Sequence, residues 1–119
     1  MSENITLKKT FTLAVEAVKF CRELQSQHKE YIISKQLMRS ATSVGAMLRE
    51  AQGAESKVDF IHKMSIALKE ANETEYWIEL LKATDSIDGL NITPLETTLK
   101  ECVRLITASV KTAKANSRK

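Results

Sequence analysis

The chain has 119 residues, 43% of them hydrophobic, which is the size and composition of a single domain that can bury one core without cross-links. Three glycines and one proline are few, and helix formers dominate, so the composition favours an all-α fold. The net charge of +3 is a weak sign of function, and no apolar run approaches the roughly 20 residues that span a bilayer, so we expect a cytoplasmic protein without a membrane segment.

The first predicted helix covers about residues 4–25. Apolar residues recur along it in alternating steps of four and three, the pattern of a helix that buries one side. We expect the buried side to consist of Leu7, Phe11, Ala14, Val18 and Cys21, with Val15 and Leu24 widening the stripe. Residues 26–33 break the period and are predicted to be a connection that leaves His28 in solvent.

The second predicted helix covers about residues 34–53, with Ser34 as its candidate N-cap. Its core side is predicted to comprise Ile33, Leu37, Ala41, Val44, Leu48 and Ala51. The opposite side carries Lys35, Arg39, Thr42, Ala46 and Arg49. This stripe thus has small side chains in its middle and positively charged residues at both ends. Such a surface suits either close packing of another helix or a groove for a phosphate chain. We favour packing, because small residues in a helix usually mark a neighbouring helix.

A tight turn at residues 53–56 leads into the third predicted helix, residues 57–84, where Ser56 and Asp59 resemble a capping box. Its core side is predicted to consist of Phe60, Ile61, Met64, Ala67, Leu68, Ala71 and Ile78. Near its end, Tyr76, Trp77 and Leu80 form a second apolar patch outside that side. Such an aromatic patch is typical of an association surface, and the alternative is that the fourth helix or a crossover covers it.

The fourth predicted helix covers about residues 94–114, after a turn at Asp88 and Gly89. Thr93 as N-cap, Pro94 at the first position and Glu96 at the third form a predicted capping box. The core side is predicted to contain Ile92, Leu95, Leu99, Cys102, Ile106, Val110 and Ala113. We expect Cys21 and Cys102 to be free, buried thiols, with a disulfide or metal pair as the minor alternative.

The outer sides of the second and third helices are the candidate oligomer interface. We expect a homo-oligomer to form through them, because four short helices cannot cover every apolar patch. The candidate interface residues are Arg39, Ser43, Ala46, Arg49, Glu73, Tyr76, Trp77 and Leu80.

Charge is distributed unevenly along the chain. Residues 54–88 carry eight acidic and four basic side chains, a balance of −4, whereas residues 89–119 carry six basic and two acidic ones, a balance of +4. Opposite the core side of the fourth helix lie Lys100, Arg104, Thr107, Lys111, Lys114 and Arg118, and the first helix has a similar row at Lys8, Lys19 and Arg22. Side by side, these rows would form a basic face for RNA or DNA phosphates. The alternatives are a merely solvated stripe, a favourable helix-dipole placement, and neutralisation by an acidic neighbouring subunit.

No catalytic constellation is visible in the sequence, so we expect no enzyme, no catalytic residues and no cofactor. Two histidines are too few for the paired Glu-x-x-His motifs of a di-iron bundle, and phosphate-binding loops and G-x-S-x-G or C-x-x-C motifs are absent. Asp59 and His62 share a helix side and are the nearest approach to a metal site, but a second half is missing, so a surface hydrogen-bonded pair is the expectation.

The segment from Gln36 to Leu81 carries a family resemblance, in its S-x-S-V-G-A run with Glu50 following and in its D-F and A-L-K-E-A-x-E-T patterns. It resembles a bacterial family of small four-helix-bundle proteins encoded in intervening sequences of 23S ribosomal RNA genes, whose relatives include the accessory variability determinants of diversity-generating retroelements. The resemblance implies an antiparallel bundle that assembles into a ring, commonly a pentamer, without catalytic activity. It also implies a basic surface that contacts nucleic acid and, in the retroelement relatives, a reverse transcriptase partner.

The sequence therefore predicts a single-domain, all-α, antiparallel up-and-down four-helix bundle. The predicted function is that of a non-enzymatic oligomeric protein, a candidate for RNA binding through the first and fourth helices. The alternative is a protein-interaction scaffold or accessory subunit, for example of a reverse transcriptase, with no direct nucleic-acid contact.

Overall fold

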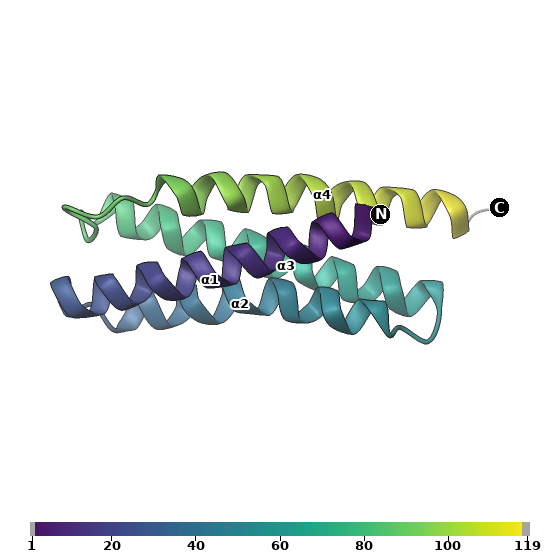
Figure 1. Ribbon diagram of the computed structural model, residues 1–119, viewed down its shortest axis with the longest axis horizontal. Coiled ribbons are helices and arrows are strands. Elements are labelled where there is room, and N and C mark those ends of the chain that lie inside the picture. The colour runs from purple at the N-terminus through teal and green to yellow at the C-terminus, as the bar shows by residue number, and fades with distance from the viewer. Residues whose placement is uncertain (1, 118–119) are drawn as a thin grey trace.

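The computed structural model describes residues 2–117, with side chains from residue 5 to residue 116, and these form four α-helices (Figure 1). The helices are α1 (Ser2–His28), α2 (Ile32–Gln52), α3 (Lys57–Ala83) and α4 (Thr93–Ser117). Successive helices are antiparallel, and α4 packs back against α1, giving a bundle of 52 × 21 × 20 Å. The predicted up-and-down four-helix bundle is confirmed, and each helix end lies within three residues of its predicted position.

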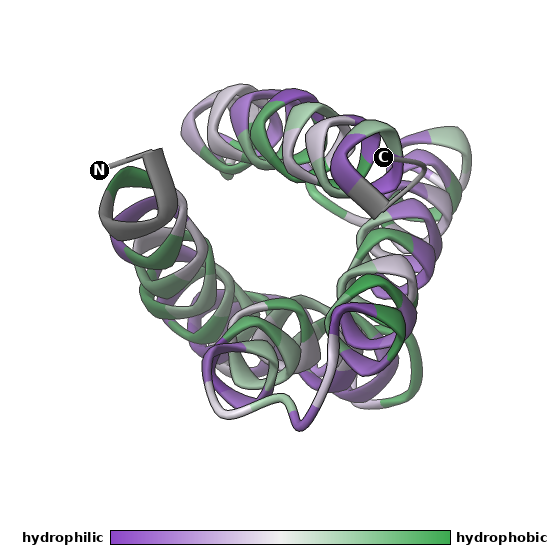
Figure 2. Ribbon diagram, turned by 90° about the vertical axis from the view of Figure 1, so that its right-hand side faces the viewer, coloured by the Kyte–Doolittle hydropathy of each residue, from purple (hydrophilic) through white to green (hydrophobic). Residues whose placement is uncertain are grey.

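The core lies along the common axis of the helices, which Figure 2 views end-on. Its largest fully buried side chains include Leu13, Leu24, Leu37, Leu48, Ile78, Leu81 and Ile106. The predicted core sides of α2 and α4 are confirmed from Leu37 to Ala51 and from Ile92 to Val110. Both cysteines are free and fully buried, as predicted. In α3 the burial is less complete than predicted, because Phe60, Ile61 and Leu68 are only partly buried.

The predicted buried side of α1 is confirmed at Cys21 and Leu24 but is wrong by about one residue in the first half of the helix. The structure buries Thr6, Thr10, Leu13, Ala17, Phe20, Cys21 and Leu24. Phe11 and Val15 lie on the surface instead, 56% and 37% exposed. Two stripes of comparable hydrophobicity lie next to each other on this helix, and the one with two threonines faces the core. Its polarity is tolerable there because a buried hydroxyl can be satisfied locally, as that of Thr10 is by the Leu7 carbonyl at 3.1 Å.

The connection between α1 and α2 is shorter than predicted and is held by Glu30. Lys29 ends α1 in the left-handed conformation, with φ 55°, and its N–H donates to the Gln25 carbonyl. The Glu30 carboxylate accepts from the N–H groups of Ile32, Ile33 and Ser34 at 3.2, 3.0 and 2.7 Å. The prediction that Ser34 caps α2 is therefore wrong. Ser34 is buried inside the helix, and its hydroxyl donates to the Glu30 carbonyl.

Small residues bring α2 close to both of its neighbours. A Cβ added at Gly45 would lie 3.3 Å from the Thr10 carbonyl oxygen of α1, which is tighter than ordinary contact. On the other side, the Ser40 and Thr74 hydroxyls are hydrogen-bonded at 2.8 Å in the buried contact between α2 and α3. The close packing of α2 inside the subunit thus falls at Gly45 and Ser40, whereas Ala46 of the predicted outer stripe is exposed.

The turns at the two ends of α3 differ in how well the sequence predicted them. Ser56 accepts from the Asp59 N–H at 3.0 Å, which confirms the predicted N-cap of α3. The predicted capping box at the start of α4 is wrong. There the Asn91 side chain accepts from the Thr93 N–H at 3.1 Å, while the Glu96 carboxylate pairs with Lys82 at 2.9 Å.

Candidate nucleic-acid interface

The basic side chains of α4 form an exposed row on the side away from its core residues. Lys100, Arg104 and Lys111 are exposed and make no ion pair with any described residue. Lys114 is exposed on the same side, and Arg118 lies outside the described residues. Three mobile cations without acidic partners leave a positive potential on this side of α4, which attracts anions.

The row on α1 continues the row on α4 along the bundle. Lys8, Lys19 and Arg22 are exposed and also unpaired among the described residues. An ion pair between Lys9 and Glu101, at 3.0 Å, fixes which levels of the two antiparallel helices are adjacent. Lys19 and Arg22 therefore extend from that level toward one end of the bundle, and Arg104 and Lys111 toward the other.

α1 and α4 pack together as expected. Because they are antiparallel, the positive side chains lie diagonally, on α1 toward one end of the bundle and on α4 toward the other. At 1.5 Å per residue, the 13 steps from Lys9 to Arg22 and the 10 steps from Glu101 to Lys111 give the six side chains a span of about 35 Å. We call this set of six side chains the basic diagonal: Lys8, Lys19, Arg22, Lys100, Arg104 and Lys111.

Most of the candidate oligomer interface comes together between α2 and α3. Arg39 bonds both Glu73 and Glu70, the latter at 3.4 Å. Glu73 also accepts from the Trp77 indole N–H at 3.2 Å, and the bonds from Trp77 and Arg39 hold the pKa of this carboxyl below its usual range. The Tyr76 ring packs edge-on against Trp77, with centroids 5.0 Å apart. We call these five residues, together with half-buried Leu80, the aromatic-acidic face.

The candidate interface residues differ in exposure and partners. Tyr76 is 55% exposed, whereas Trp77 is half-buried and packs against the core. On α2, Ala46 is exposed and the Ser43 hydroxyl donates to the Arg39 carbonyl. Arg49 does not join this face. Its guanidinium lies over the Phe11 ring of α1, 5.5 Å from the ring centroid.

Phe11 is the surface residue that the sequence prediction missed. Its apolar spacing with Leu7 and Ala14 favoured the core, and the competing stripe of Leu13, Ala17 and Phe20 has the same spacing. A signal was present in the sequence, because the cations Lys8, Lys19 and Arg22 fall on the helix side of Phe11 rather than on the side of Leu13. The exposed faces of α1 and α2 thus contribute an aromatic ring and a guanidinium that are stacked together.

Asp59, the carboxylate considered with His62 as a metal site, pairs with a lysine. Asp59 binds Lys63 at 3.0 Å, and this bond together with the Glu55 N–H lowers the pKa of the Asp59 carboxyl. Within residues 2–117, the structure brings together no group of three or more His, Cys, Asp or Glu side chains that could hold an ion. The thiols of Cys21 and Cys102 are buried, and burial raises the pKa of each to about 12.

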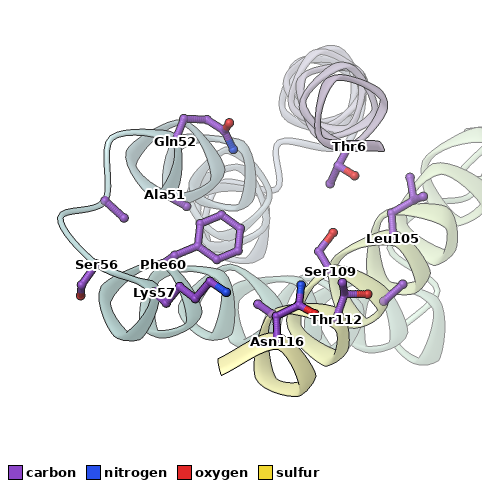
Figure 3. A pocket seen from close by; sticks show the side chains of 13 residues that line it. Thr6, Ala51, Gln52, Ser56, Lys57, Phe60, Leu105, Ser109, Thr112 and Asn116 are labelled. Carbon is purple, nitrogen blue, oxygen red and sulfur yellow. The ribbon is translucent and has the colours of Figure 1, made fainter. Parts of the chain in front are cut away.

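A pocket of about 660 Å³ opens at the end of the bundle where α1 begins and α4 ends. Thr6, Phe60 and Leu105 line it together with polar side chains of α4 such as Ser109 and Asn116 (Figure 3). None of the predicted site residues lies in its wall. The described basic side chains of α1 and α4 are therefore a surface feature and not part of this pocket.

Residues 2–108 match the 23S rRNA-intervening sequence proteins. The chain belongs to that family. A solved structure, of a protein of unknown function from the S23 ribosomal protein family of Bacteroides thetaiotaomicron VPI-5482, is 42% identical, with a TM-score of 0.89, over 93% of this chain and 99% of that one. The bundle is therefore the fold of this family member, and the resemblance expected from residues 36–81 is confirmed over nearly the whole chain. No curated protein matches the chain, and none of its described helices is long and apolar enough to cross a membrane.

Proposed function

We propose that the protein is a non-enzymatic, self-associating nucleic-acid-binding protein that contacts a phosphate backbone through the basic diagonal. The observation that carries this proposal is the presence of six exposed cations without ion-pair partners among the described residues, aligned over two adjacent helices. Their alignment suits a polyanion better than a small acidic ligand, because none of the six lines either of two pockets found among the described residues. Membership of the 23S rRNA-intervening sequence family supports RNA as the first nucleic acid to test.

Charge reversal on α4 tests the proposal. The double variant Arg104→Glu/Lys111→Glu should abolish binding of a labelled structured RNA in an anisotropy titration, because both side chains are exposed and oppose the phosphates once reversed. The matched control is Lys57→Glu/Lys69→Glu, which makes the same change in net charge at exposed positions of α3. Circular dichroism and light scattering establish that fold and assembly survive. Unchanged binding by the α4 variant, or equal loss in the control, would contradict the proposal.

The salt dependence gives a second, quantitative test of the same contacts. The slope of log K against log salt is negative for phosphate contacts. Neutralising two of them with Arg104→Gln/Lys111→Gln should reduce its magnitude by about 1.4 to 1.8. A slope equal to that of the unmodified protein would mean that these side chains touch no phosphate, whatever the affinity.

A second candidate function, a protein-interaction scaffold or accessory subunit, is favoured by the exposure of Tyr76 on the aromatic-acidic face. In that case one dominant protein should be recovered with the chain after nuclease treatment, and Tyr76→Ala should abolish its recovery. Recovery that disappears with nuclease would favour the nucleic-acid proposal instead.

A further inference from the structure

Phe11 lies in an exposed stripe on α1 that contains cations but no acid. Lys8, Phe11, Val15, Lys19 and Arg22 follow one another at steps of three and four, and all are exposed. The acidic residue in this stretch, Glu16, lies on the side of α4, where one of its carboxylate oxygens is buried and its charge acts on the Cys102 thiol. The stripe is about 21 Å long.

Exposing the Phe11 ring to water is unfavourable, and the packing of α1 in the bundle does not depend on this ring. Phe11 is 56% exposed although the neighbouring buried stripe supplies the core contacts of α1. Arg49 of α2 reaches across to lie over the ring, 5.5 Å from its centroid. A guanidinium over an aromatic ring keeps its positive charge, and both groups have flat faces on which a base can stack.

We infer that Phe11 and Arg49 form a stacking platform for an unpaired base of a single-stranded nucleic acid, whose phosphates run along Lys8, Lys19 and Arg22. This inference rests on the proposed function, because it places the backbone on the α1 part of the basic diagonal. Aromatic and guanidinium planes between rows of cations are the arrangement by which proteins hold single strands, since every base offers a face for stacking. The charge row favours this occupant over an apolar protein segment, because such a segment would leave three cations unpaired at its contact.

Paired oligonucleotides separate stacking from phosphate contact. One is a single-stranded RNA of mixed sequence, and the other has the same length and backbone but carries abasic sites in place of its central bases. Phe11→Ala should bind the intact strand about 5- to 150-fold more weakly and the abasic strand with unchanged affinity. Phe11→Leu should behave like Phe11→Ala, because it keeps the apolar contact and removes only the ring. The matched control is Tyr31→Ala, since Tyr31 is also an exposed aromatic residue, at 47%, and lies at the start of α2.

A fluorescent variant observes the stacking directly. Trp77→Phe removes the single tryptophan, and Phe11→Trp in that background places an indole on the platform. The intact strand should quench this indole, whereas the abasic strand should leave its emission unchanged.

The possible outcomes distinguish a failure of the stacking inference from a failure of the proposed function. If the unmodified protein binds both strands equally and Phe11→Ala changes neither, stacking is overturned while phosphate binding stands. If the unmodified protein binds no strand even at low salt, the proposed function fails and the inference with it. If Phe11→Ala lowers the mass in light scattering and Phe11→Leu restores it, the platform is a contact between subunits and the inference is wrong.

Discussion

Phe11 and Leu13 lie two positions apart on α1 and face opposite environments. Leu13 is fully buried, so Leu13→Ala should cost about 2 to 5 kcal/mol of unfolding free energy through lost contacts and the cavity left behind. Phe11→Ala should cost no more than about 1 kcal/mol, the size of an exposed cation–π contact. Urea denaturation of both variants measures the difference. Equal losses would mean that the helix is rotated from the position described above.

The two thiols make stability depend on alkaline pH. Burial raises the pKa of Cys21 and Cys102 from the ordinary value of 9.0 to about 12. The thiolate form is therefore favoured in the unfolded chain. Between pH 9 and 12 the unfolded chain binds fewer protons than the folded chain. Stability should be fully present below pH 9 and fall above it, by up to about 1.4 kcal/mol per pH unit for each thiol.

Comparison with a double variant checks this dependence. Cys21→Ala/Cys102→Ala removes both titrating groups, so its denaturation midpoint should fall less steeply between pH 8 and 10.5 than that of the unmodified chain. In the unmodified chain, a thiol reagent at pH 8 should react only as fast as the protein opens. Rapid reaction under native conditions would contradict the burial of both side chains.

At the scale of single elements, Glu30 has the most specific role. Its carboxylate accepts three N–H groups at the start of α2, where Tyr31 supplies no side-chain cap. Glu30→Ala should therefore destabilise the protein by about 1 to 2 kcal/mol, as loss of an N-cap does. Thermal or urea denaturation measures it, with exposed Glu23→Ala on α1 as the control. A loss no greater than that of the control would show that water replaces the carboxylate at no cost.

The sequence predicts α2 and α4 well because each has a single apolar stripe with a polar opposite side. In α1 two stripes compete, and the apolar pattern alone does not choose between them. The choice depends on tertiary features such as the close approach of Thr10 to Gly45 and the local satisfaction of buried hydroxyls. Glu30 was missed for a similar reason, since a carboxylate before the helix rarely substitutes for Ser, Thr, Asp or Asn at the N-cap itself.

In the candidate site, too, some features could be predicted from the sequence and others could not. The exposure of Lys8 and Lys100 follows from their helix positions and was predictable. The relative position of α1 and α4 along the bundle was not predictable, because it is set by packing and by the ion pair of Lys9 with Glu101. The stacking of Arg49 on Phe11 joins two helices and has no signature in the spacing of either.

At the scale of the whole molecule, the aromatic-acidic face and the basic diagonal lie on different helices. We expect self-association, as a pentamer if the chain follows the family resemblance, so light scattering after gel filtration should give about five times the 13.4 kDa chain mass. Tyr76→Ala should lower this mass without unfolding the subunit, because the side chain is exposed and outside the core. A monodisperse monomer at micromolar concentration would refute the assembly.

The control for the assembly experiment is Tyr31→Ala, because Tyr31 has a similar exposure and lies on another part of the chain. If it lowers the mass as much as Tyr76→Ala does, the loss is not specific to the aromatic-acidic face. If neither variant changes the mass, subunits meet elsewhere.

The up-and-down connectivity also determines the order in which the bundle can form and come apart. Each of α2 and α3 packs against the helix before and after it in the chain, so these contacts form between near neighbours with little loop-closure entropy. The contact of α1 with α4 joins opposite ends of the sequence and is the least extensive of the contacts between helices. We therefore expect it to form last and open first. Since the basic diagonal includes side chains of both helices, a polyanion bound to α1 and α4 at once should slow the opening of the bundle.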